Sequence, residues 1–181
     1  MTPPRITVVD YDPAWPRRFD ALHATLWPEL SAHAFTLEHV GSTSVAELAA
    51  KPIIDAAVVV EDSAVLPSVI AVLATHGYVH RGDLGVPGRE AFHPPARTFA
   101  HHLYACVRDN LGLRNHLALR DALRRDPQKA REYGALKKRL ADRFPHDIDA
   151  YVAGKTDFIL AVLRDTGFAE DELSAIRAVN T

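Results

Sequence analysis

Residues 37–60, LEHVGSTSVAELAAKPIIDAAVVV, decide the fold. A short alternating run ends there at Gly41 and leads into three hydroxyl residues, and the apolar run 53–60 then carries a single acid, Asp55. A turn rich in backbone N–H and hydroxyl donors, facing a carboxylate on a strand, is the arrangement expected to hold a phosphate and its metal ion. We therefore take this turn and Asp55 as the centre of the candidate site.

Two strands and a short helix are expected within this stretch. Residues 35–40 alternate between apolar and polar side chains, which predicts a half-buried strand. Residues 53–60 are almost continuously apolar, which is typical of a strand covered on both faces, with Asp55 and Ala57 on the same face. Residues 43–50 predict a short helix that ends before Pro52.

The elements around this stretch predict a mixed sheet with helices. An edge strand is expected at residues 6–9, followed by a helix that Asp12 caps and that Pro28 kinks or stops in its last turn. A second helix is expected from residue 62 to Gly77. Further strands are expected at residues 78–81, 91–93 and 97–107. No two-residue hairpin joins them, so the sheet is expected to be mixed.

From Asn110 onward the pattern becomes helical. Asp126 before Pro127 and Asp147 after Pro145 predict helix starts, and a short last helix is expected before the end of the chain. We therefore expect an α+β core over residues 1–109. A helical region over residues 110–181 is expected to pack on this core, so that the two form one compact unit. The predicted fold class is α+β, with helices flanking a mixed sheet.

Composition narrows the classes of function. The formal net charge of −2 leaves no basic footprint for nucleic acid, so no nucleic-acid partner is expected. The single cysteine excludes an intrachain disulfide and fits a reducing compartment. Neither a signal peptide nor an apolar stretch long enough to span a bilayer is present, so we expect a cytoplasmic protein without a membrane partner. The sequence does not determine the oligomeric state.

Several distinctive segments are spread over most of the chain: HVGSTSV at 39–45 with AKPIID at 50–55, YDPAWP at 11–16, GVPGR at 85–89, HHLY at 101–104 and RNHLALRD at 114–121. These segments resemble the motifs of the GrpB family, also called UPF0157, which is grouped with the nucleotidyltransferase superfamily. The resemblance implies a small mixed sheet flanked by helices. It also implies a Gly-Ser turn that holds nucleotide phosphates and paired acids that bind Mg²⁺ for attack on the α-phosphate.

One departure from that pattern affects catalysis. Ala57 stands where the second metal-binding acid of the superfamily is expected. One carboxylate together with substrate phosphates can hold a Mg²⁺ ion, but two closely spaced ions need another acid. The candidates for that acid are Asp83, Glu90 and Asp109 in loops, and Glu47, which replaces part of a common family dipeptide.

The candidate site residues follow from these patterns. Asp55 is the candidate metal ligand and catalytic acid, and His101, at a position that resembles a family histidine, is the second catalytic candidate. Lys51 either pairs with a phosphate or lies on the surface. Arg89 either clamps an anion or forms an ion pair within its loop. The full set of candidate ligand-binding residues is Gly41, Ser42, Thr43, Ser44, Lys51 and Arg89.

Three hypotheses for function follow. The leading one is a nucleotidyltransferase-like protein that binds a nucleotide or another phosphorylated small molecule with Mg²⁺, and Ala57 leaves open whether it transfers a nucleotidyl group and is an enzyme. The second is a module of the same fold that binds a ligand or partner without catalysis. The third is a metal site built from histidines, for which His39 and His101 are the candidates on predicted inward faces.

Overall fold

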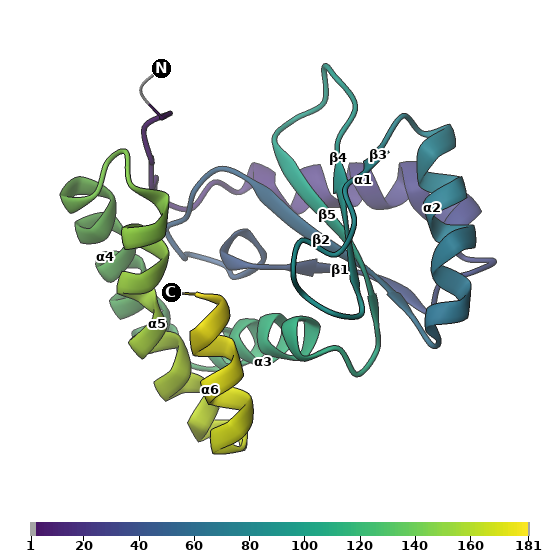
Figure 1. Ribbon diagram of the computed structural model, residues 1–181. Coiled ribbons are helices and arrows are strands. Elements are labelled where there is room, and N and C mark those ends of the chain that lie inside the picture. The colour runs from purple at the N-terminus through teal and green to yellow at the C-terminus, as the bar shows by residue number, and fades with distance from the viewer. Residues whose placement is uncertain (1–2, 181) are drawn as a thin grey trace.

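A mixed five-stranded sheet lies at the centre of the protein in the computed structural model, which describes residues 3–180 (Figure 1). The strand order is β1-β2-β5-β4-β3. Strands β2 and β5 are parallel, and the other neighbouring pairs are antiparallel, which confirms the mixed sheet. The strands are β1 (Thr36–Val40), β2 (Ile54–Val60), β3 (Val79–His80), β4 (Arg89–His93) and β5 (His101–Val107).

Strand β2 lies inside the sheet, and its sequence explains why. All its residues except Asp55 are buried, as expected for a strand covered on both faces. The register places Asp55 opposite Val40 of β1 and opposite His102 of β5. Because directly paired residues point to the same face, Asp55 and His102 share one face, and the preceding pair, Ile54 and His101, shares the other.

One face of the sheet is closed by two helices. Helix α1 (Ala14–Leu30) and helix α2 (Leu66–Thr75) pack on it, and a 3₁₀ turn, η2 (Ser63–Val65), leads into α2. The side chains of this core come from both helices and four strands, and they include Leu22, Leu26, Leu30, Val69, Leu73, Ala56, Val58, Leu37, Phe92, Leu103 and Ala105. Helix α1 continues through Pro28 and ends two residues later at Leu30, and the buried Leu26 and Leu30 hold its last turn against the sheet.

The other face is partly covered by the C-terminal helices, drawn in green to yellow in Figure 1. The helices are α3 (Leu111–Arg125), α4 (Pro127–Arg143), α5 (Ile148–Asp165) and α6 (Glu170–Val179). Asp126 and Asp147 accept hydrogen bonds from backbone N–H groups in the first turns of α4 and α5, which confirms both predicted caps. None of the helices in the described part of the chain is long and apolar enough to cross a membrane.

Three expectations for local structure are wrong. Residues 6–9 form no strand, because only Val9 finds a partner, in a single bridge to Ala50. The stretch 43–50 is not a helix, since a 3₁₀ turn, η1 (Ser42–Ser44), is followed by a turn with Glu47 at positive φ. The last strand begins at His101 rather than at residue 97, because Arg97 also has a positive φ.

Candidate functional site

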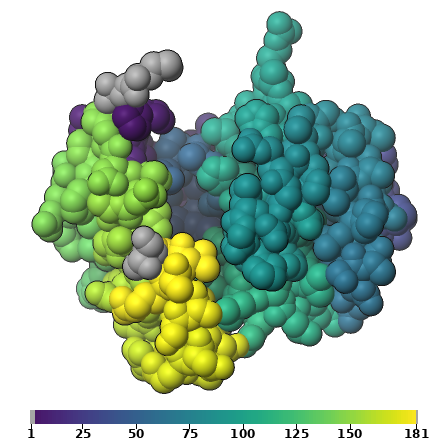
Figure 2. Space-filling view, in the orientation of Figure 1, coloured from purple at the N-terminus to yellow at the C-terminus, as the bar shows by residue number. Residues whose placement is uncertain are grey.

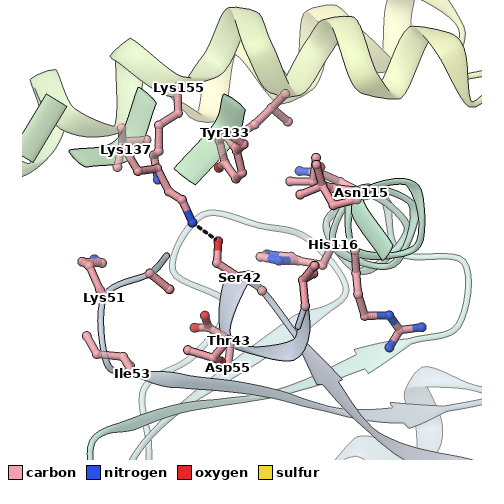
Figure 3. Close-up of a pocket in the computed structure, with 18 of the residues that line it drawn as sticks. Ser42, Thr43, Lys51, Ile53, Asp55, Asn115, His116, Tyr133, Lys137 and Lys155 are labelled. Atoms are coloured by element: carbon pink, nitrogen blue, oxygen red, sulfur yellow. Dashed lines mark hydrogen bonds between the residues drawn. The ribbon is translucent and has the colours of Figure 1, made fainter. Parts of the chain in front are cut away.

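A cleft of about 370 Å³ opens at the Asp55 end of the sheet. Figure 2 shows the hollow between the C-terminal helices in green and yellow and the teal part of the molecule. Its floor is the turn after β1 together with the first residues of β2 and β5, and its walls are α3 on one side and α4 with α5 on the other (Figure 3). A cleft of this size is in the range of small-molecule sites.

The floor depends on glycine at position 41. Gly41 has φ 69° and ψ −174°, a conformation that only glycine adopts readily. A Cβ at this position would also overlap the Oδ2 atom of Asp55. The bare backbone therefore lets the turn lie directly against the carboxylate. On the other side of the carboxylate, His102 Nδ1 donates a hydrogen bond to Asp55 Oδ1 at 2.8 Å.

The three hydroxyl residues after Gly41 have separate roles. Ser42 lines the cleft and bonds a lysine from α4. Thr43 also lines it, but its Oγ1 is 3.0 Å from His39 Nε2. Ser44 Oγ donates to the carbonyl oxygen of Gly41 at 2.6 Å and does not line the cleft. Among these hydroxyls, that of Ser42 is therefore the best placed to contact a ligand.

Three lysines converge on the cleft. Lys137 of α4 is buried, and its Nζ donates to Ser42 Oγ at 2.7 Å (Figure 3). Lys155 of α5 and Lys51 of the loop before β2 place their amines 4.6 and 5.8 Å from the centre of the Tyr151 ring. None of the ion pairs within residues 3–180 involves Lys51, Lys137 or Lys155. The cleft therefore gathers amines without carboxylate partners within bonding distance.

Burial changes the proton affinity of two of these amines. It lowers the pKa of Lys155 to about 8, with help from the neighbouring Lys51 and against the opposing pull of Asp55. Burial also holds the pKa of Lys137 well below its ordinary value, and Lys155 adds to the effect. An anionic ligand would favour the charged form of both amines.

The wall opposite α4 and α5 comes from α3. Asn115, His116 and Leu119 line it, and burial lowers the pKa of His116, so its imidazole is neutral near pH 7. Among the lining residues that the structure describes, Asn115 alone has a buried side-chain oxygen without a hydrogen-bond donor. Arg120 and Leu123 of α3 also line this wall.

Lys137 and Lys155 were not among the residues predicted for the site, although the sequence carries a signal for them. Lys137 lies four residues after Tyr133 and three before Leu140, within the apolar stripe of its helix. Lys155 lies four residues after Tyr151 in the same way. A lysine inside an apolar stripe points its amine toward the interior, and there it needs a partner.

Besides Ser44, two predicted site residues lie outside the cleft. His101 is on the closed face, where Tyr78 OH donates to its Nε2 and its Nδ1 donates to the Phe99 carbonyl oxygen, both at 2.8 Å. Its neighbour His102 lines the cleft instead. Arg89 of β4 stacks on the ring of Tyr104 at 4.9 Å and donates to the carbonyl oxygen of Asp83. The structure thus brings together Gly41, Ser42, Thr43, Lys51 and Asp55, but not Ser44, Arg89 or His101.

The carboxylates do not fit a two-metal centre. Among the described residues that line the cleft, Asp55 is the only acid, and the residue beside it on the same face of β2 is Ala57. The cross-strand neighbours of Ala57 are Tyr104 and Glu38, and Glu38 Oε2 accepts a hydrogen bond from Arg120 Nη1 at 2.7 Å. The other acids considered from the sequence, Glu47, Asp83, Glu90 and Asp109, do not line the cleft.

The histidines do not form a metal site either. His39 and His101 lie on the closed face, where each ring bonds protein atoms. Burial lowers the pKa of His39 to about 4. Within residues 3–180, no group of three or more His, Cys, Asp or Glu side chains could hold a metal ion.

The fold defines the class of protein. The structure superposes on the Cid1 poly(U) polymerase, solved with MgGTP bound, with a TM-score of 0.55 over 75% of this chain and 45% of that one. The sequence identity is 17%, so this likeness concerns the fold. The protein therefore has a nucleotidyltransferase-like fold.

The family is defined by closer matches. A family profile described as GrpB protein matches residues 5–165, and the chain belongs to this family. The crystal structure of GrpB from Enterococcus faecalis is similar, with 35% identity, a TM-score of 0.78 and coverage of 93% of this chain and 98% of that one.

Two curated relatives are longer than this chain. The UPF0157 protein YqkA of Bacillus subtilis is 32% identical over 155 residues, which cover 86% of this chain and 45% of the relative. The UPF0157 protein PA4798 of Pseudomonas aeruginosa is 34% identical over 165 residues, which cover 88% and 66%. The chain thus spans about half to two thirds of the length of these relatives.

Proposed function

We propose that the cleft binds a nucleotide or another phosphorylated small molecule, with Lys51, Lys137 and Lys155 around its phosphates. The observation that carries this proposal is the set of three lysine amines that share one cleft and have no carboxylate partner. Like charges brought together in a partly buried site raise the free energy of the folded protein unless an anion offsets them. A phosphate group supplies that anion and several acceptor oxygens.

The surroundings of the lysines support a phosphate rather than a carboxylate ligand. The Gly41 turn brings backbone and the Ser42 hydroxyl to the same point as Lys137 Nζ. A phosphate accepts several hydrogen bonds at once from such a mixed set of donors. Leu119 and Leu123 of α3 offer an apolar surface for the organic part of the ligand.

Ligand binding is better supported than nucleotidyl transfer. Transfer by the superfamily mechanism requires two metal ions held by closely spaced acids. In this chain Ala57 occupies the second position, and the nearby Glu38 is engaged by Arg120. We therefore propose a binding function for this cleft and assign no transfer step to it.

Binding can be tested by calorimetric titration of the purified protein with ATP, CTP, GTP and UTP, first in Mg²⁺ and then in EDTA. We expect at least one of them to bind, and Lys137→Met to weaken that binding by about tenfold or more, since a charge-assisted hydrogen bond is lost. Lys138→Met is the matched control, because the next lysine along α4 pairs with Asp10 and is exposed. Absence of binding by every nucleotide at millimolar concentration would refute the proposal.

A further inference from the structure

Cationic side chains surround Asp55, in the space where a metal-dependent enzyme needs acids. The four charged side chains that line the cleft besides Asp55 are all cationic: Lys51, Lys137, Lys155 and Arg120. Arg120 is neutralised by Glu38 and Asp121 at 2.7 Å each, but the three lysines have no such partners. The unpaired charge of the cleft is therefore positive.

A divalent cation would meet unfavourable conditions in this cleft. One oxygen of Asp55 already accepts a hydrogen bond from His102, and Ala57 offers no second carboxylate. Lys137 and Lys155 both interact electrostatically with Asp55, so the carboxylate charge is shared with amines. A Mg²⁺ ion at Asp55 would be repelled by these same amines, because like charges in a partly buried site are weakly screened.

The lysines can perform the neutralising role that metal ions perform elsewhere. The phosphate chain of a free nucleoside triphosphate or of inorganic tripolyphosphate carries several negative charges near pH 7, and three amines offset most of them. Lys137 donates to Ser42, and Lys51 and Lys155 lie beside Tyr151. Lys51 and Lys155 also act electrostatically on Lys137, so the three amines form one cationic group. Such a group suits a ligand with more than one phosphate better than a monophosphate, because the larger anion offsets more of its charge.

We propose that the cleft selects the metal-free form of a di- or triphosphate, with Lys51, Lys137 and Lys155 taking the place of the divalent cations. This inference rests on the proposed function, since it specifies the form of the ligand that the same cleft binds. It also predicts that a monophosphate binds more weakly than a triphosphate with the same organic group.

The test compares binding of ATP and of inorganic tripolyphosphate in EDTA and in excess Mg²⁺, by calorimetric titration of the full chain. We expect binding in EDTA to be at least as tight as in Mg²⁺, because Mg²⁺ competes with the lysines for phosphate oxygens. Tighter binding in Mg²⁺ would overturn this inference and leave the proposed function standing. Absence of binding under both conditions would overturn both.

Three variants sharpen the test. Lys155→Met should weaken tripolyphosphate binding by about tenfold, and Lys155→Arg, which keeps the charge, should restore most of it. Ala57→Asp adds a carboxylate beside Asp55 and should weaken binding in EDTA more than in Mg²⁺, because a second acid favours a metal ion. Lys138→Met should leave binding unchanged. Equal affinity of Lys155→Met and the unchanged protein for tripolyphosphate would overturn the inference.

Discussion

The two faces of the same sheet differ in how their polar groups are satisfied. On the face covered by α1 and α2, His39 and His101 are buried and bond Thr43, Tyr78 and a backbone carbonyl. On the opposite face, the lysines of the cleft lack acidic partners. Adjacent residues of β5 thus have opposite roles, since His101 belongs to the closed face and His102 to the cleft. Buried polar side chains whose hydrogen bonds are satisfied serve the structure, whereas charged side chains without partners indicate a binding site.

The largest difference between the faces is expected from a carboxylate placed on each of them. Ala56→Asp puts an acid among the apolar side chains beneath α1 and α2, where its cross-strand neighbour His39 already bonds Thr43, and it should cost more than about 4 kcal/mol and abolish cooperative folding. Ala57→Asp, one residue along, points to the opposite face and into the small pocket that Arg89 also lines, so the new acid has a cationic partner nearby and should still fold with a lower melting temperature. Circular dichroism melts of both variants measure the difference. Equal loss of folding in both would contradict the contrast between the faces.

A smaller but still large effect is expected at Gly41. Gly41→Ala should lower the free energy of unfolding by about 3 kcal/mol or more, because it combines backbone strain with overlap against Asp55. Gly85→Ala is the matched control, since Gly85 also has a positive φ but an added Cβ there meets nothing within 4 Å. Urea denaturation of both variants separates strain from overlap. If both variants lose the same stability, the close approach of turn and carboxylate is not what requires glycine.

Some parts of the fold can be predicted from the sequence, and others cannot. Strand β2 and the caps of α4 and α5 follow from local signals, namely an unbroken apolar run and an aspartate at each helix start. The failed strand at residues 6–9 shows the limit of such signals, because a β-branched run needs a neighbouring strand that the sequence does not reveal.

Only part of the candidate site could be predicted from the sequence. The Gly41 turn and Asp55 lie near each other in the chain, so their spacing is visible in the sequence. Lys137 and Lys155 reach the cleft only through the docking of α4 and α5, and charged helix residues usually face solvent. The choice between His101 and His102 likewise depends on which sheet face is covered, and the alternation of β5 alone does not decide it.

The pH dependence of stability should report the unpaired charge of the cleft. The pKa of Lys155 is lowered to about 8 from 10.5, so between these values the unfolded chain binds more protons than the folded one. The contribution of Lys155 to stability therefore rises with pH across this window, by at most about 3 kcal/mol. Urea denaturation at pH 7 and pH 10 should show a smaller rise in Lys155→Met. An identical rise in both proteins would show that Lys155 is not the titrating group.

The smallest effects are expected from the two adjacent histidines. His101→Ala should lower the free energy of unfolding by about 1–3 kcal/mol without changing nucleotide affinity, because it leaves buried partners unsatisfied on the closed face. His102→Ala should change stability by less than about 1 kcal/mol, since its bond to Asp55 is partly exposed, but it should change nucleotide affinity. Denaturation and calorimetry of both variants test this reversal. Loss of nucleotide affinity in His101→Ala but not in His102→Ala would show that His101, and not His102, acts in the cleft.

The origin of the lysines has a consequence for how the molecule moves. Asp55 and the Gly41 turn lie on the sheet, whereas Lys137 and Lys155 follow more than 80 residues later on α4 and α5. A bound anion would bridge these two parts of the chain and would stabilise their docked arrangement relative to any opened one. Amide hydrogen exchange along α4 and α5 should then slow when the cleft is filled, although most of those amides contact no ligand. Ligand binding in the cleft would therefore make α4 and α5 more rigid, although these helices are distant in sequence from Asp55.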